Sequence, residues 1–306
     1  MELITGTQIF DQISPADWNT LAQTGMTDTP FQTYAYQKAW WTHLGPGELY
    51  TIVIRDEATN ELKGIAPFFL DDGRLQFNGS KEETDYLDII AKEQDAEAVW
   101  AAVFDCLYRG DFPDWQTIDL HCLPAASPSR DIVPQLADGR GFILSHEQEE
   151  VCPVIPLNCS FEEYLMSIDK KQRHEIRRKF RRANGGGAEF EIIGPEDDLH
   201  AAVDEFLDLL QKSTPEKNDW LNEGRTAVFH EVAEAAMAAG TLQLMFIQVR
   251  GERCAALFNF DYDGRIWVYN SGLDMRKHSR LSLGVVLTSH AIELAAEAGH
   301  HTFDFL

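Results

Sequence analysis

Positive charge is scarce in this chain. Its 306 residues include 26 Lys and Arg against 50 Asp and Glu, which gives a formal net charge of -24. Attraction to a phosphate backbone needs a positive surface, so this balance excludes DNA as a general partner and counts against tRNA. Any anionic partner therefore has to be bound by a local group of cations.

Cysteines are few, and long apolar runs are absent. The five cysteines are scattered without a CxxC pair, which argues against a zinc site and against a secreted disulfide framework. The pair His300–His301 has no partners at metal-ligand spacing. No apolar run approaches the roughly 20 residues of a membrane span, and the first residues do not resemble a signal peptide. We expect a cytoplasmic protein with no transmembrane segment and no metal.

The second half of the chain shows a clear order of elements. Ser160, three residues before Glu163, is a capping-box signature for a helix start, and glycines at 185–187 are expected to end the helical region. After it we expect a strand at 188–194, helices from 197 and at 225–239, strands at 242–249, 254–262 and 265–270, a helix at 285–298 and a strand at 301–306. The order is β-α-α-β-β-β-α-β.

The first half gives nearly the same order. We expect a strand at 2–10, helices at 15–23 and 32–44, strands at 49–55, 62–70 and 74–79, a helix at 96–108 and a strand at 116–123. A helix at 129–136 and strands at 141–147 and 152–157 are expected to follow. The chain is therefore predicted to be mixed α/β (α+β), with two copies of one fold at 1–156 and 157–306. Because the second copy stops where the first adds these elements, we expect it to be C-terminally truncated.

The cations of this acidic chain gather in one helix. Residues 170–182 hold eight Lys and Arg and one Glu, which is +8 − 1 = +7. We expect Lys170, Lys171, Arg173 and Arg177 to contact an anionic acceptor. Trp220 is expected to line one side of the acceptor site. Two alternatives stay open: a solvated face neutralised by the protein's own acids, and attachment to an anionic lipid surface.

An ordered set of segments resembles a known family. These segments are "FQTYAYQKAWW", "SIDKKQRHEIRRKFRRA", "LLQKSTPEKNDWL", "GRIWVYNSGLD", "SRLSLGVVL" and "HHTFDFL". They resemble GNAT acyltransferases of the cellulose-biosynthesis (CelD/BcsL) type, which are similar in turn to the Fem-type peptidoglycan aminoacyltransferases. The resemblance covers most of the chain, is densest at 161–306, and implies tandem GNAT (acyl-CoA N-acyltransferase) folds.

The resemblance implies one acyl-CoA site, in the second half. In the GNAT fold, the loop after the fourth strand and the start of the next helix surround the pyrophosphate, because free helix N–H groups attract anions. The residues expected to bind acetyl-CoA or another acyl-CoA are Tyr269, Asn270, Arg276, Lys277, Arg280, Ser282, Leu283, Gly284 and Val285. The equivalent first-half loop carries Glu82, Glu83, Asp85 and Asp88 and is expected to repel a pyrophosphate. The alternative is that Ser282 only caps the helix and Gly284 only packs.

Acyl transfer requires few protein groups. Backbone N–H groups near Tyr269 and Asn270 are expected to polarise the thioester carbonyl. Asp274 or Asp304 is the expected base, and Tyr269 the expected acid for the leaving thiolate. Each has an alternative role: Asp274 as a turn residue, Asp304 as a strand-end acid and Tyr269 as a core aromatic.

Three functions are compatible with these features. The first is transfer of an acyl group from acyl-CoA to an amine or hydroxyl of a saccharide-, lipid- or peptide-related acceptor. The second is a Fem-like aminoacyltransferase that uses aminoacyl-tRNA. The third is a non-catalytic module that binds a phosphate-rich or anionic ligand. Binding of a CoA thioester separates the first from the third.

Overall fold

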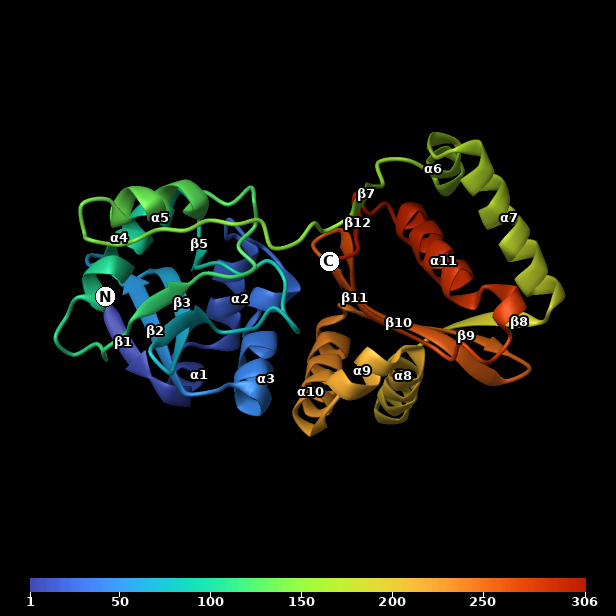
Figure 1. The fold of residues 1–306 in the computed structure, drawn as a ribbon, viewed down its shortest axis with the longest axis horizontal. Helices are drawn as coiled ribbons and strands as arrows, with labels where there is room; N and C mark the ends of the chain where they lie inside the picture. Colours follow the sequence, from blue (N-terminus) through green and yellow to red (C-terminus); the bar gives the residue numbers. More distant parts are fainter. The chain divides into compact units, whose positions relative to one another are not determined.

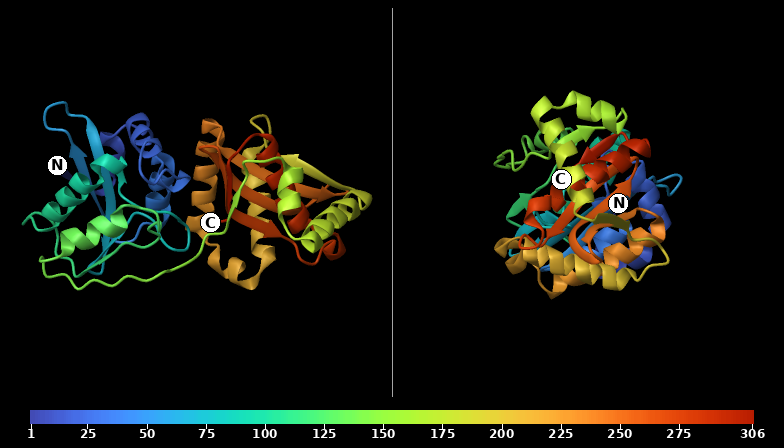
Figure 2. Two further views of the ribbon diagram at one scale, coloured as in Figure 1. Left: turned by 90° about the horizontal axis from the view of Figure 1, so that it is seen from above. Right: turned by 90° about the vertical axis from the view of Figure 1, so that its right-hand side faces the viewer.

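The chain folds into two compact units. The computed structural model describes residues 1–306, and the units are Met1–Glu150 and Val151–Leu306. Figures 1 and 2 show each unit as a β-sheet covered by helices. None of the helices combines the length and the apolar character needed to cross a membrane.

The first unit is built on one mixed sheet. Its strands are β1 (Glu2–Thr5), β2 (Glu48–Arg55), β3 (Leu62–Asp71), β4 (Arg74–Phe77), β5 (Ile90–Ala91) and β6 (Thr117–Asp119), and its α-helices are α1 (Ile9–Gln12), α2 (Pro15–Gln23), α3 (Tyr34–Leu44), α4 (Ala96–Leu107) and α5 (Ser129–Ala137). The strand order is β1-β2-β3-β4-β6, with β5 paired to β3. Only the β4–β6 pair is parallel.

The second unit repeats this plan. Its strands are β7 (Val154–Pro156), β8 (Ala188–Ile192), β9 (Leu242–Val249), β10 (Glu252–Tyr262), β11 (Arg265–Leu273) and β12 (Thr302–Asp304), and its α-helices are α6 (Phe161–Ser167), α7 (Lys170–Gly185), α8 (Leu199–Ser213), α9 (Pro215–Trp220), α10 (Glu223–Ala239) and α11 (Leu283–Glu297). The strand order is β7-β12-β11-β10-β9-β8, and only β11 and β12 run parallel.

Two helical layers enclose the sheet of the second unit (Figure 1). On one side, Val286 and Leu287 of α11 share a buried core with Ala183 of α7 and with Phe303 of β12. On the other side lie α8, α9 and α10. Gly272 lets α8 approach β11 closely, because a Cβ at this position would lie 2.6 Å from the backbone nitrogen of Leu210.

The shared element order of the two copies is confirmed, and several details are corrected. The segment at 6–12 is helical rather than the end of a strand. Residues 141–147 form no strand, since Phe142 packs on the rings of Phe104 and Trp115 while Ile143 and Leu144 are exposed.

A further correction concerns the strand expected at 152–157. It forms β7, which pairs with β12 in the second sheet instead of ending the first copy. The boundary between the units therefore lies after Glu150 rather than after Pro156. After β6, the first unit adds only α5.

Candidate active site

The candidate site begins where the pairing of β11 with β12 ends. The two strands pair over only three positions, from Arg265–Thr302 to Trp267–Asp304, and β11 then continues to Leu273 without this partner. Tyr269 is the extra residue of a β-bulge, since Phe258 pairs with Asn270 and Asn259 with Val268. Beyond Trp267, this side of β11 is an open strand edge.

Two backbone amides of this stretch donate to side chains. The N–H of Ser271 donates to Oδ1 of Asn270 at 2.9 Å, and the N–H of Leu273 donates to Oγ of Ser213 at 2.8 Å. Side-chain oxygens can be displaced by an extended ligand that carries its own acceptors, as in strand addition to a sheet edge. The open edge of β11 can therefore hold a linear molecule with amide groups.

A lysine lies on the same strand. Lys217 of α9 donates from Nζ to Oδ1 of Asn270 at 2.8 Å and to the carbonyl oxygen of Ser271 at 2.7 Å. Burial lowers the pKa of Lys217, because desolvation disfavours its charged form. The amine forms no ion pair with a carboxylate. Lys217 is a candidate site residue that the sequence analysis missed, although Thr214–Pro215 has the chemistry of a helix start.

Asp304 is the last residue of β12. It pairs with Trp267 at the last shared position, and its side chain is buried. Because Phe303 points into the core beside α11, Asp304 faces the side covered by α8 and α10. Its Oδ1 accepts a hydrogen bond from the N–H of Leu306 at 2.8 Å. One expected base therefore lies beside the point where the open edge of β11 begins.

Tyr269 and Asp274 are found in different surroundings. The Tyr269 ring packs on Phe229 and Phe260, with ring centroids 5.3 Å away in both cases. Burial alone would raise the pKa of Asp274, but the Arg276 N–H and the charges of Arg276 and Lys277 hold the pKa below its ordinary value. In this arrangement the Asp274 carboxylate orders the loop after β11.

The start of α11 carries no side-chain cap. Ser282 has a left-handed backbone with φ of 56°, and its hydroxyl makes no capping hydrogen bond, so the alternative that it only caps the helix is wrong. A Cβ on Gly284 would meet only Leu273, at an ordinary 3.5 Å. The expected cofactor residues Leu283, Gly284 and Val285 thus form the first turn of α11, where N–H groups attract anions.

A basic hollow borders this helix start. It has a volume of about 370 Å³ and is lined by Gly186, Val249, Arg250, His278, Ser279, Arg280 and Leu281. No acidic residue lines it. Arg182 of α7 donates to the carbonyl oxygen of Arg280 at 3.0 Å and so fixes the loop. The hollow has the charge that a phosphate requires.

The expected acceptor residues are not on one surface. Helix α7 packs beside α11, whereas Trp220 belongs to α9 on the other face of the sheet (Figure 1). Arg173 donates to the carbonyl oxygens of Leu165 and Met166 at 3.2 and 3.3 Å, where it completes the end of α6. Arg177 is paired with Glu162.

The two lysines expected to contact the acceptor are in a different state from the two arginines. Lys170 and Lys171 are exposed and form no ion pair. Part of the basic face is therefore neutralised by the protein's own acids, as the first alternative predicted, and part is available to an anion.

The equivalent loop of the first unit is a structural element. Glu83 is buried and accepts from the indole N–H of Trp40 at 3.3 Å. Asp88 is also buried and accepts hydrogen bonds from the hydroxyls of Ser127 and Ser129. The acids of this loop thus stabilise the first unit.

The second unit has the family signature of an acyl-transferring domain. The family model described as an acetyltransferase (GNAT) domain matches residues 170–306. The chain is an acyltransferase whose residues 170–306 form a GNAT domain. No curated protein sequence matches the chain.

Solved structures resemble the whole chain. FemX is 12% identical, with a TM-score of 0.66, over 100% of this chain and 88% of FemX. L-PGS from Bacillus licheniformis is 11% identical, with a TM-score of 0.56, over 95% of this chain and 75% of L-PGS. A conserved protein of unknown function from Bacteroides thetaiotaomicron is 13% identical, with a TM-score of 0.58, over 96% of this chain and 88% of that protein. At such identities the likeness establishes the fold: this acyltransferase has tandem GNAT folds, and the CelD/BcsL subtype stays a prediction.

Proposed function

We propose that this acyltransferase moves an acyl group, as acetyl, from a CoA thioester directly to an amine or hydroxyl. The donor's amide-containing arm would extend along the open edge of β11. Its phosphates would meet the first turn of α11 and the basic hollow beside Arg280. The observation that carries the proposal is the stretch of β11 after Trp267, which has no paired strand on this side and lies next to an uncapped helix start.

The groups at the opening have the chemistry that transfer needs. The Asp304 carboxylate would take the proton from the attacking nitrogen or oxygen. Lys217 and the amides of β11 would stabilise the negative charge that develops on the thioester oxygen. The carbon–sulfur bond then breaks as the new acyl bond forms, and the thiolate takes a proton, with Tyr269 as the proposed donor.

The acceptor is proposed to be saccharide-, lipid- or peptide-related. Trp220 is proposed to contact a sugar ring or an apolar chain of the acceptor. It lies on α9 with Lys217, and its side chain is only partly buried. Arg225 stacks over the Trp220 ring, 4.7 Å from its centroid, which holds the indole in place. Lys170 and Lys171 on α7 are proposed for anionic parts of a larger acceptor.

Aminoacyl-tRNA is the second candidate donor. Helix α7 adjoins the loop before α11 through Arg182, and Arg181 next to it is exposed and makes no ion pair. A row of cations beside the proposed phosphate site would favour a long polyanion over a small cofactor. The acidity of the remaining chain counts against it.

Calorimetric titration with acetyl-CoA tests the proposal. We expect the wild type to bind, Gly284→Glu to lose binding because a carboxylate would occupy the phosphate position, and Gly284→Ala to retain it. Equal binding by the wild type and both variants would place the cofactor elsewhere. A wild type that binds charged tRNA but not acetyl-CoA would favour the second donor. A chain that binds neither would overturn both proposals.

A further inference from the structure

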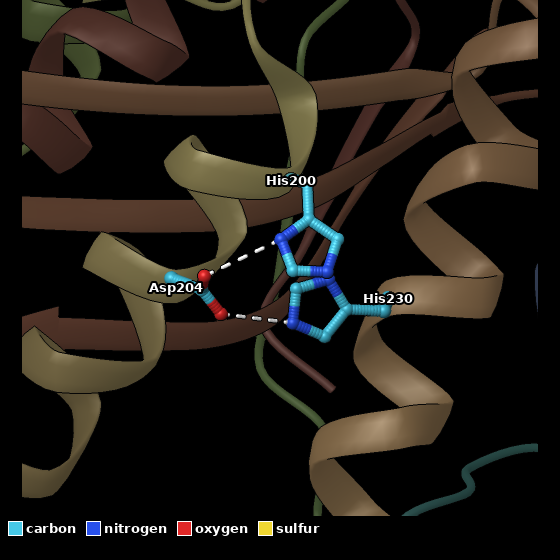
Figure 3. Close-up of side chains that lie close together, drawn as sticks. All are labelled: His200, Asp204 and His230. Carbon is cyan, nitrogen blue, oxygen red and sulfur yellow. Dashed lines mark hydrogen bonds and ion pairs between the residues drawn. The ribbon is translucent and has the colours of Figure 1, made fainter.

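A group of three potential metal ligands lies away from the candidate active site. His200 and Asp204 are one turn apart on α8, and His230 lies opposite them on α10 (Figure 3). Nδ1 of His200 is 3.3 Å from Oδ2 of Asp204, and Nε2 of His230 is 3.0 Å from Oδ1 of Asp204. The three side chains come from two helices and converge at one point.

These separations suit a metal. In a tetrahedral site with bonds of roughly 2.0–2.1 Å, two ligand atoms lie about 3.3 Å apart. The ligand atoms of the three residues all lie within 4.8 Å of one another, and His200 and Asp204 are exposed and can adjust. Because each imidazole faces a different carboxylate oxygen, a shared ion would be bound by both oxygens or by one after a small rotation.

The electrostatics of this cluster also favour a cation. The two imidazole rings stack with centroids 4.1 Å apart, so both are held on the same side of the cluster. Neutral imidazole is the form that binds metals. Glu234 follows His230 by one turn of α10, which adds negative charge along the same face.

We propose that His200, Asp204 and His230 bind a divalent transition metal of the zinc class. Two imidazoles and one carboxylate match the ligand preference of Zn²⁺, and water would complete four-coordination. The ion ties α8 to α10. These helices flank α9, which carries Lys217, so the ion stabilises the arrangement that holds this lysine on β11.

Another group of potential ligands is less suited to this role. Glu252, Cys254 and His278 also lie close together. However, Glu252 is already paired with Lys277, and the Cys254 thiol is buried and donates to a backbone carbonyl. Burial also raises the pKa of Cys254, which disfavours the thiolate that binds metals.

Titration with ZnCl₂ tests the proposal, with calorimetry for affinity and thermal unfolding for stability. We expect one ion per chain and a higher Tm for the wild type. In His200→Ala we expect binding at least tenfold weaker and no Tm increase, whereas the matched control His174→Ala, an exposed helical histidine on α7, should behave as the wild type. Visible absorption of a Co²⁺ complex reports whether the coordination is tetrahedral.

His200→Ala should lose metal binding without a loss of folding or of acetyl-CoA binding, so the metal site can be tested separately from the proposed function. His200 is 68% exposed, so its loss leaves the core intact, and acetyl-CoA binding by His200→Ala should equal that of the wild type. No Zn²⁺ binding by the wild type, or equal binding by the wild type and His200→Ala, would overturn the proposal. The cluster would then be a hydrogen-bonded helix contact only.

Discussion

Nζ of Lys217 lies 2.7 Å from the carbonyl oxygen of Ser271, in the part of β11 that extends past its pairing with β12. The six-residue helix α9 places this amine there, because Thr214 caps its start and Pro215 occupies its first turn. A cation thus lies beside the proposed donor edge without a carboxylate partner.

The pKa of Lys217 is expected to be lower than that of an ordinary lysine. Burial makes its charged form unfavourable, so the amine should lose its proton at a lower pH than lysine in a peptide. NMR titration of ¹³C-labelled lysine side chains measures this, and the spectrum of Lys217→Arg assigns the resonance. A Lys217 resonance that titrates like a peptide lysine would contradict the assignment.

Removal of the Lys217 amine is expected to slow catalysis. We expect Lys217→Met to lower kcat at least tenfold, while the Kd for acetyl-CoA changes less than threefold, because the amine is proposed to act on developing charge. The control Lys212→Met removes only the ion pair of a half-buried lysine with Asp208. Similar rates for the two variants would remove Lys217 from the proposed mechanism.

Arg182 is expected to order the loop before α11. Arg182→Ala loses the hydrogen bond to the Arg280 carbonyl and should weaken acetyl-CoA binding severalfold. Its neighbour Arg181 is exposed and makes no such contact, so Arg181→Ala removes the same charge without this bond. Calorimetry should distinguish the two, and equal weakening would show that charge alone matters.

Asp88 is expected to make the first unit less stable as pH rises. Burial raises the pKa of Asp88 to about 6 in the folded state from 3.8, despite the hydrogen bonds it accepts. The folded state therefore binds its proton more tightly, and this stabilisation is complete below pH 3.8 and is lost as pH rises through about 6. Between pH 5 and 7.5 the loss should be about 1 kcal/mol.

Urea unfolding of the wild type and Asp88→Asn measures this effect. Tryptophan fluorescence is suitable, because five of the seven tryptophans belong to the first unit. The free energy of unfolding of Asp88→Asn should improve relative to the wild type as pH rises, whatever the offset between the two proteins. Parallel pH profiles would show that the Asp88 pKa is ordinary.

Gly272 is expected to tolerate no side chain. A Cβ would lie 2.6 Å from the Leu210 nitrogen, so Gly272→Ala should push α8 away from β11 and cost about 1–3 kcal/mol. Gly284→Ala has room and should be neutral or more stable by about 0.5–1 kcal/mol, because alanine favours a helix. Chemical unfolding followed by circular dichroism compares them, and equal losses would contradict the close packing at Gly272.

Much of the fold could be predicted from residue patterns. Alternating apolar residues and turns at Gly251 and Asp263–Gly264 gave the antiparallel strands β9, β10 and β11. The capping box at Ser160 and Glu163 is present at the start of α6. These features depend on neighbours in sequence, so local chemistry specifies them.

Other elements depended on distant partners. Residues 141–147 are apolar enough for a strand, yet Phe142 packs on aromatic rings and no strand forms. Val154–Pro156 has a strand pattern that does not show which sheet it joins, and it joins the second by pairing with β12. Helix α9 is too short for a periodic signal, so Lys217 was missed.

The sequence by itself determined the element order of both units, the concentration of cations in α7 and the acidic character of the remaining chain. Only the tertiary structure decided that β11 pairs with β12 only as far as Trp267, that Arg173 and Arg177 contact other parts of the protein, and that His200, Asp204 and His230 meet. The physical reason is the distance along the chain over which each interaction acts. Periodicity, caps and turns act over a few residues, whereas a strand opening, an ion pair or a group of ligands exists only when packing brings distant parts of the chain together.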